Sequence, residues 1–192
     1  MFQVRIHGRG GQGVVSGAEL LSVAAFVDGR HAQAFPSFGS ERMGAPVMAF
    51  VRIDQRPIRL REPVLRPDAL IIQDPTLLPQ ADLFNGLRDD GVVLINSARS
   101  SDELGLARFA QAGRAIRVVT LPATEIALRH VGRALPNVPL LAALVAVCGQ
   151  VELASLLDAI EQRFAPKVAA GNIAAAREAH ALAKSMPEAA DA

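Results

Sequence analysis

Tryptophan and tyrosine are absent from this 192-residue sequence, which contains one cysteine, Cys148. Without Trp and Tyr, the aromatic side chains that often stack on single-stranded nucleic acid are missing. One thiol cannot build a disulfide framework, a cysteine-rich zinc site or a four-thiolate iron–sulfur cluster, so any redox metal is expected on a partner chain. Because Cys148 lies in an apolar run, we predict that it is a small buried hydrophobic residue.

An excess of charge of one sign is missing as well. The chain has 20 Lys and Arg residues against 19 Asp and Glu residues, a formal charge of +1, which argues against nucleic acid as a partner. Apolar runs long enough to span a membrane and a charged leader with a cleavage site are also missing, so we expect a cytoplasmic protein without a membrane partner. With 51% hydrophobic residues the chain can bury one core, and we predict a single domain over residues 1–192.

Hydrophobic periodicity predicts alternating strands and helices, and then a helical C-terminal third. We expect a three-layer, Rossmann-like α/β fold, with an open, mixed but mostly parallel sheet, helices on both faces and an inserted hairpin. The hairpin would join two strands through residues 54–56. Strands are predicted at residues 2–6, 31–35, 47–53, 57–61, 68–74, 91–97 and 115–121. Helices are predicted at residues 14–26, 79–87, 101–113, 122–132, 138–149, 151–164 and 167–186.

A glycine cluster follows the first predicted strand. Gly8, Gly10 and Gly13 fall on the G-x-G-x-x-G spacing, between a strand and a helix. Such a turn lets backbone N–H groups approach an anion at the positive end of the helix, and therefore favours phosphate recognition. A purely architectural turn is the other interpretation. Gln12 favours the functional one, because an amide between Gly11 and Gly13 can reach a ligand or a neighbouring chain.

A self-contained, Rossmann-type NAD(P)-binding oxidoreductase is the main alternative that this spacing supports. In that class an Asp or Glu near the end of the second strand binds the ribose hydroxyls, roughly 20 residues after the loop. Here the second predicted strand ends at Phe35 and Pro36, and the next acidic residue, Glu41, lies inside the following loop. The missing acid argues against NAD.

The loop at residues 35–46, FPSFGSERMGAP, is the second unusual segment. This loop and the glycine loop should leave the carboxyl edge of adjacent parallel strands, where ligands collect in open α/β sheets, so we expect them to form one surface. The candidates for that surface are Ser37, Gly39, Arg42 and Gly44. An ordinary surface loop with solvated charges is the other interpretation.

Together these segments resemble a known family. IHGRGGQGVVSGAELL and AFPSFGSERMGAPVMAFVRID are similar to the gamma subunit of the 2-oxoacid:ferredoxin oxidoreductases, most closely to the pyruvate type. The similarity covers nearly the whole chain, through VRIDQRPIRLREPVLRPDALIIQDPTL, GVVLINS and PNVPLLAALVAV. The resemblance implies a subunit of an assembly that converts a 2-oxoacid, CoA and an oxidised acceptor into acyl-CoA, CO2 and the reduced acceptor.

The resemblance also implies cofactors and partners that this chain does not supply. The assembly would contain an alpha, a thiamine-binding beta and a ferredoxin-like delta subunit, with thiamine diphosphate, Mg2+ and [4Fe-4S] clusters. Electrons would leave to ferredoxin or to an NAD-reducing subunit. The sequence shows no Gly-Asp-Gly followed by the Asn-containing stretch of a thiamine diphosphate and magnesium site, so we expect no catalytic residue, metal or cofactor on this chain alone. The second loop favours pyruvate, with an aromatic or branched 2-oxoacid as the alternative substrate.

By the same resemblance the chain would help to cover the active site and to bind CoA. An arginine fork suits a phosphate because it binds two oxygens at once. The residues expected to face CoA or the active site are Gly8, Gly10, Gly11, Gln12 and Gly13 from the glycine loop, and Ser37, Gly39, Arg42 and Gly44 from the second loop. A third hypothesis is a non-catalytic interaction domain, whose apolar C-terminal helices dock a partner and which makes no contact with CoA.

Two further groups of residues have a structural interpretation. The arginines of the predicted hairpin would add positive field near the loops, but we favour solvated or subunit-facing charges. His7 is interpreted as a core histidine that supports the glycine loop, not as a base. The hairpin arginines are Arg52, Arg56, Arg59 and Arg61.

Overall fold

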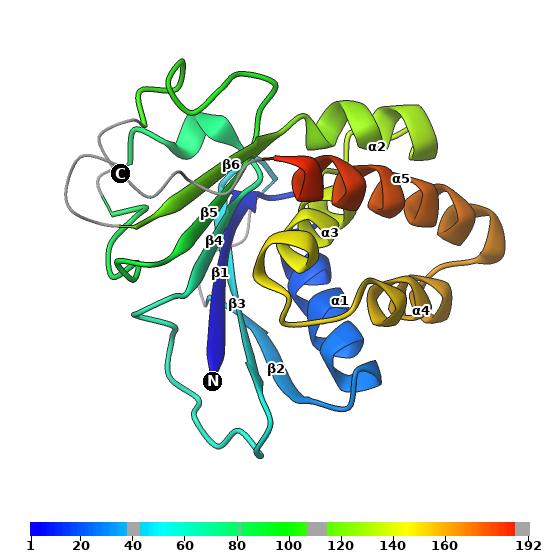
Figure 1. Cartoon of the computed structure of the whole chain (residues 1–192), viewed down its shortest axis with the longest axis horizontal. Coiled ribbons are helices and arrows are strands. Elements are labelled where there is room, and N and C mark those ends of the chain that lie inside the picture. The colour runs from blue at the N-terminus through cyan, green and yellow to red at the C-terminus, as the bar shows by residue number, and fades with distance from the viewer. Residues whose placement is uncertain (38–42, 81, 107–114, 187–192) are drawn as a thin grey trace.

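The computed structural model describes residues 1–37, 43–80, 82–106 and 115–186, and its strands form one six-stranded sheet (Figure 1). The strand order is β2-β3-β1-β4-β5-β6. The strands are β1 (Phe2–Arg9), β2 (His31–Pro36), β3 (Pro46–Asp54), β4 (Ala69–Ile72), β5 (Val92–Asn96) and β6 (Arg117–Leu121). The helices are α1 (Val14–Val27), the short 3₁₀ helix η1 (Pro75–Leu77), α2 (Ala123–Val131), α3 (Asn137–Cys148), α4 (Leu153–Arg163) and α5 (Pro166–Ser185).

The sheet is mixed and mostly parallel, as predicted. β1, β4, β5 and β6 run parallel to one another, whereas β3 is antiparallel to both β1 and β2. β3 therefore lies between β1 and β2, and β2 forms one edge of the sheet. Because β1 and β2 are both antiparallel to β3, they run in the same direction and end at the same side of the sheet.

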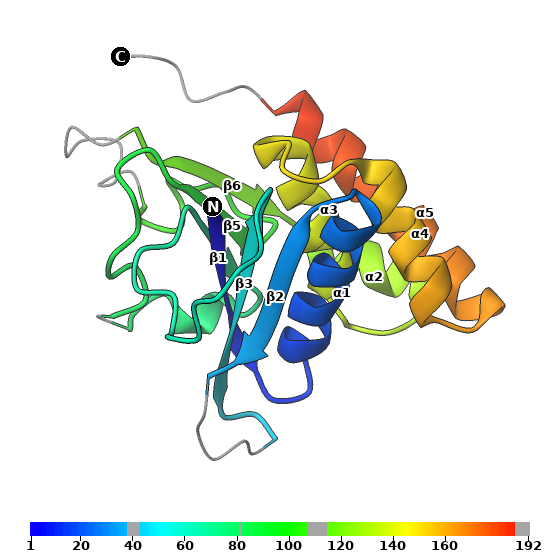
Figure 2. The ribbon, with the colours of Figure 1, turned by 90° about the horizontal axis from the view of Figure 1, so that it is seen from below.

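All α-helices in the described residues lie on one face of the sheet, and the views in Figures 1 and 2 agree on this arrangement. Val4 and Ile6 of β1 point into this layer and are fully buried. Gly17 lets α1 approach α3 closely, because a Cβ there would lie 3.4 Å from Asn137 Cβ and 4.0 Å from Leu141 Cδ1. α3 is apolar around most of its circumference because α1, α2, α4, α5 and the sheet surround it. The helical C-terminal third is thus confirmed.

The opposite face of the sheet differs from the prediction of helices on both faces. Its buried side chains include Leu77, Leu83, Leu87 and Leu106, which pack on Leu70 and Ile72 of β4 and Val93 and Ile95 of β5. These leucines lie in η1, in a turn or in irregular segments that follow turns, so a third layer exists but contains no α-helix among the described residues.

Two predicted helices on this face are therefore corrected. The helix at 79–87 is wrong, because its described residues form turns and Gly86 takes a φ of +76°. The helix at 101–113 is a turn up to residue 105, where Gly105 has a φ of +70°. A positive φ interrupts a right-handed helix. The rest of that segment, residues 107–114, lies outside the described residues.

The predicted strand at 57–61 is also wrong, and the hairpin is formed elsewhere. β3 uses both of its edges to pair with β1 and β2, so a following segment finds no free edge beside it. Residues 57–66 contain two prolines and form neither strand nor helix. The antiparallel pair is instead β2 and β3, joined through residues 37–45.

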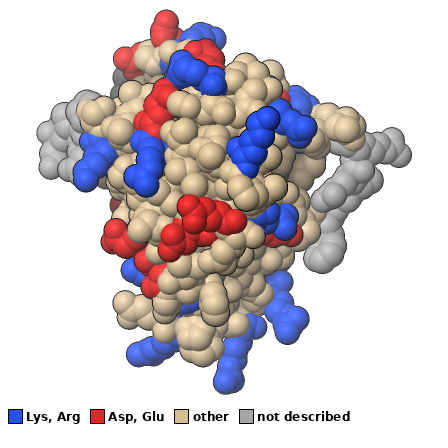
Figure 3. All heavy atoms as spheres, turned by 90° about the vertical axis from the view of Figure 1, so that its right-hand side faces the viewer, with Lys and Arg blue, Asp and Glu red and all other residues tan. Residues whose placement is uncertain are grey.

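The surface fits the balanced composition. Figure 3 shows the helical side of the molecule, where Lys and Arg are scattered among Asp and Glu. No helix in the described part of the chain is long and apolar enough to cross a membrane. Cys148 ends α3 half-buried against the core, and burial raises the pKa of its thiol to about 12.

Candidate functional site

The glycine loop and the second loop lie together, as predicted, although for a different reason. Their strands are not adjacent and parallel; β3 lies between β1 and β2, and its first residue pairs with Arg9 at the end of β1. The N–H of Gly10 donates to Ala45 O at 2.9 Å, and the N–H of Gly44 donates to Gly10 O at 3.2 Å. Arg9 Nη1 also donates to Gly44 O at 3.1 Å. Hydrogen bonds therefore join the two loops directly.

The remaining residues of the second loop are placed as follows. The N–H of Ser37 donates to Met48 O at 2.8 Å, and Ser37 lines a cavity on the opposite face of the sheet from α1. Gly39 and Arg42, both expected to face CoA, lie outside the described residues. The predicted phosphate contact of Arg42 therefore stays a prediction.

Gln12 uses its amide within the loop. Its Oε1 accepts from the N–H of Arg9 at 2.8 Å, and its Nε2 donates to Asp74 Oδ2 at 3.1 Å. Both ends of the side chain thus hold the turn between β1 and α1. In this structure the amide is bonded within the loop at both ends and is not free to reach a ligand, so Gln12 is a positioning residue.

Asp74 is the anchor of the loop and was not among the residues predicted from the sequence. Its carboxylate accepts from Arg9 Nε at 3.0 Å and from Thr76 N and Oγ1 at 2.9 and 2.6 Å, besides the bond from Gln12. Burial opposes ionisation of Asp74, but the bonds from Thr76 and Gln12 and the charge of Arg9 outweigh it and lower the pKa of Asp74. The available signal was Asp-Pro-Thr directly after a buried strand, which is typical of a helix N-cap.

Two glycines of the loop are required by close approach. A Cβ on Gly8 would lie 2.6 Å from Val14 Cγ2 and 2.9 Å from Gln12 Oε1. Gly13 has a φ of +74°, and a Cβ there would lie 2.7 Å from Asn137 Nδ2. Asn137, at the start of α3, donates to Gly13 O at 3.3 Å. The glycine spacing thus serves two purposes: it lets the turn pack against α3, and it leaves room for a ligand to approach the backbone.

The start of α1 presents several backbone donors. The N–H groups of Gly11, Gly13, Val14 and Ser16 form no hydrogen bond with any residue that the structure describes. Gly11, Gly13 and Ser16, with Met43, line a cavity of about 440 Å3. The first N–H groups of a helix and its macrodipole favour an anion at this position.

A second cavity continues on the other side of the same loop. It has a volume of about 590 Å3 and is lined by Gly11, Gly13 and Ser16 on one side. The cations Arg133, Lys167 and Arg163, the last paired with Glu19 at 3.3 Å, line its other side together with residues of α3, α4 and α5. Positive side chains therefore lie opposite the amino end of α1, which makes the cavity suited to an anion.

The residues given a structural interpretation differ in how they agree with it. His7 contacts Arg5, whose Nε donates to His7 Nε2 at 3.1 Å, and it does not bond to the glycine loop. Burial, and then the charge of Arg5, lower the pKa of His7 to about 3, so the ring is neutral. Arg52 is 1% exposed, with its guanidinium 5.4 Å from the Phe35 ring centre.

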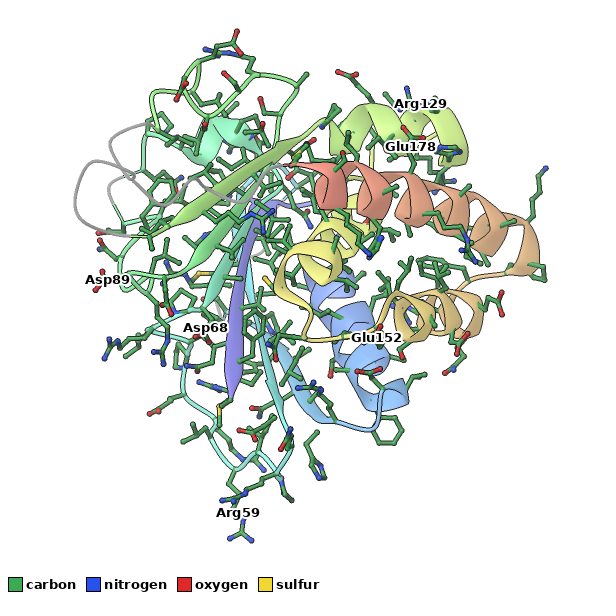
Figure 4. All side chains as sticks on the ribbon, in the orientation of Figure 1. Arg59, Asp68, Asp89, Arg129, Glu152 and Glu178 are labelled. Atoms are coloured by element: carbon green, nitrogen blue, oxygen red, sulfur yellow. The ribbon has the colours of Figure 1, made fainter. Side chains whose placement is uncertain are left out.

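Arg52 therefore contradicts the interpretation of the hairpin arginines as solvated charges. It donates to Glu62 O at 2.6 Å and to Gln3 Oε1 at 3.2 Å, and so ties the irregular segment after β3 to the sheet. Arg56, Arg59 and Arg61 are exposed, and Figure 4 shows Arg59 at the far end of that segment, pointing away from the molecule.

The geometry does not support a dinucleotide site. In a Rossmann fold the second strand is the parallel neighbour of the first, and its end supplies the acid for the ribose. Here the antiparallel β3 occupies that place beside β1. The acid nearest the loop, Asp74, follows β4 and is already bound by Arg9 and Gln12.

Comparison with known proteins agrees with the resemblance. Residues 3–182 match the family described as pyruvate ferredoxin/flavodoxin oxidoreductase. The pyruvate synthase subunit PorC of Methanothermobacter thermautotrophicus is 44% identical over 94% of both chains. The common gamma subunit of the pyruvate and ketoisovalerate oxidoreductases of Pyrococcus furiosus is 42% identical over 94% of this chain and 96% of that one.

A solved structure shows the same fold. The pyruvate oxidoreductase subunit PORC of Thermotoga maritima superposes with a TM-score of 0.80 at 37% identity, over 94% of this chain and 95% of that one. Sequence and structure therefore agree over almost the full length of the chain and of its relatives. The chain belongs to the pyruvate ferredoxin/flavodoxin oxidoreductase family, and within it to the gamma-type subunits.

Proposed function

We propose that this chain works in an assembly that converts a 2-oxoacid, CoA and an oxidised acceptor into acyl-CoA, CO2 and the reduced acceptor. Similarity to subunits named for pyruvate and ketoisovalerate, over 94% of the chain, supports this proposal. The second loop favours pyruvate among the 2-oxoacids. The acceptor is ferredoxin or an NAD-reducing subunit.

The redox and thiamine chemistry is assigned to the other subunits. The described residues contain no group of three or more His, Cys, Asp or Glu side chains that fits a metal, and Cys148 is half-buried with a thiol pKa of about 12. A cluster needs several thiolates. These residues do not fit a [4Fe-4S] cluster or a thiamine diphosphate and Mg2+ site. We place those groups on the alpha, beta and delta subunits.

The role of this chain, in our proposal, is to bind the phosphates of CoA beside the active site. The observation that carries it is the set of unbonded N–H groups at Gly11, Gly13 and Val14, residues that line the cavity of about 440 Å3. Gly11 and Gly13 also line the cavity of about 590 Å3, whose wall includes Arg133 and Lys167. Backbone donors and cations together neutralise a phosphate without needing a specific base or sugar contact. Gln12 and Asp74 support the site by fixing the loop.

Lys167 provides a sharp test, because the chain has two lysines and both lie on α5. Lys167 lines the cationic cavity near the start of the helix, whereas Lys184 lies exposed in its last turn. In the reconstituted complex, Lys167→Gln should raise the KM for CoA about three- to tenfold, the loss expected for one charged contact. The KM for the 2-oxoacid should stay unchanged, and Lys184→Gln should behave as wild type.

The outcomes separate the hypotheses. Unchanged CoA kinetics in Lys167→Gln and Arg133→Gln, with normal assembly, would leave the chain as an interaction domain without a CoA contact. Hydrogen exchange of the full complex gives an independent readout, since CoA should slow exchange at Gly11, Gly13 and Val14. Protection by NAD(P) but not by CoA would instead favour a nucleotide-dependent oxidoreductase.

A further inference from the structure

Two polar side chains occupy β1 on the sheet face that lies opposite the α-helices. Arg5 pairs with Leu70 and His7 with Ile72 of β4, so all four side chains share that face. Leu70 and Ile72 belong to a buried apolar cluster. An arginine in such a place requires an explanation, because a desolvated cation is costly unless a negative charge compensates it.

The charge of Arg5 is not compensated within the described chain. Its side chain is nearly buried, at 7% exposure, and donates from Nε to His7 Nε2 at 3.1 Å and from Nη2 to Leu83 O at 2.8 Å. Both acceptors are neutral. Burial lowers the pKa of Arg5, and no carboxylate of the described residues offsets that effect. The guanidinium is therefore a buried cation without a counter-ion.

Arg5 and His7 form part of the wall of a cavity of about 680 Å3. The volume lies in the range of small-molecule sites. Asp82 also lines it, accepts from Asn85 Nδ2 at 2.7 Å and forms no ion pair with Arg5. The apolar part of the wall comes from Val47, Met48, Leu77 and Leu83.

We propose that this cavity binds a carboxylate attached to an apolar body, with the Arg5 guanidinium as its counter-charge. Arg5 Nη1 makes no hydrogen bond to a described residue and is available for a carboxylate oxygen. Because Nε2 of His7 accepts from Arg5, the neutral ring carries its proton on Nδ1, which is a second donor. The apolar wall accommodates the rest of the ligand.

The carboxylate has two possible sources with the same chemistry. It belongs either to a free organic acid or to an Asp or Glu side chain that a partner subunit inserts. The proposal does not rest on CoA binding, because Arg5 and His7 line neither of the two cavities at the glycine loop, with which this cavity shares only Val47 among the described residues. Failure of the CoA proposal would leave it untouched, and the reverse also holds.

Phenylacetate and its neutral isostere phenylacetamide test the first source on the full chain. In the arm for a free acid, phenylacetate shifts the 15Nε–1H resonance of Arg5 and saturates, whereas phenylacetamide does not. Arg5→Gln then weakens binding about tenfold or more, which corresponds to loss of a charge-assisted contact. Arg88→Gln is the matched control, since Arg88 lies outside the cavity and pairs with Asp68.

Assembly tests the second source. If a partner supplies the carboxylate, phenylacetate shows no binding to the chain, and Arg5→Gln lowers recovery of the partner subunits with a tagged chain at least fivefold. Arg88→Gln should leave that recovery unchanged. Arg5→Lys, which keeps the charge, replaces Arg5→Gln if the latter does not fold, and should lose less than Arg5→Met. Equal binding of acid and amide, or no probe binding together with normal recovery in the Arg5 variants, would overturn the proposal.

Discussion

Replacement of Asp74 with asparagine should destabilise the chain by removing the anchor of the glycine loop. Asparagine keeps one acceptor for Thr76, but its amide nitrogen cannot accept from Arg9 or Gln12. Hydrogen bonds to a charged acceptor contribute about 1.5–3 kcal/mol, whereas an ion pair as exposed as that of Arg9, at 34%, contributes less than about 1 kcal/mol. We expect a loss of about 2–3 kcal/mol.

Thermal unfolding measures this loss directly. For a chain of this size about 1 kcal/mol corresponds to 2–4 °C, so Asp74→Asn should lower Tm by about 4–12 °C at pH 7. Asp158→Asn is the matched control, because Asp158 is exposed on α4. A decrease of less than about 1 °C in Asp74→Asn would refute the anchoring role. One cooperative transition in the wild type would agree with the predicted single domain.

The pH dependence supplies a second check with a definite sign. The pKa of Asp74 is lower in the folded chain than in the unfolded chain. Its contribution is therefore complete above the unfolded value of about 3.9 and is lost as the pH falls through the lower folded value. The difference in stability between wild type and Asp74→Asn should shrink below about pH 4. A difference that stays constant to pH 2 would exclude the carboxylate as its cause.

Two further predictions concern buried titratable groups. Because the pKa of His7 is about 3 in the folded chain, unfolding takes up a proton between that value and about 6.5, so the free energy of unfolding should decrease on acidification through this window. Denaturant titrations at pH 7 and 5 should therefore show a larger decrease in the free energy of unfolding for the wild type than for His7→Gln. Burial raises the pKa of Cys148 to about 12, so its thiol should react with a disulfide reagent at pH 8 only after unfolding, and rapid labelling of the native chain would contradict this.

Local patterns predicted the elements whose residues carry their own signals. The last helices are examples: helices expected at 138–149 and 167–186 are observed at Asn137–Cys148 and Pro166–Ser185. Periodicity places their buried faces, and glycine or proline marks their ends. The turn from β1 into α1 is predicted in the same way, because its signal is local. A Cβ on Gly8 would collide with Val14 and Gln12, which lie in the same turn.

Contacts between residues far apart in the sequence could not be predicted from local patterns. Whether residues 57–61 form a strand depends on a free edge beside β3, and β1 and β2 already occupy both edges. The same limit applies to the site. Asp74 binds Gln12 across 62 positions and Asn137 binds Gly13 O across 124, so neither partner shares a local motif with the loop.

The insertion of β3 also explains why a G-x-G-x-x-G spacing occurs here without a dinucleotide site. The glycines determine the turn and the unbonded N–H groups at the start of α1, and these features suit any anion. The identity of a nucleotide is read instead by the strand that follows, through an acid at its end. In this chain β3 replaces that strand beside β1 and brings Gly44 and Ala45 against Gly10. The glycine loop therefore keeps its capacity for a phosphate, while the segment beside it is the loop that leads into β3. The CoA kinetics of Lys167→Gln test whether a phosphate binds there.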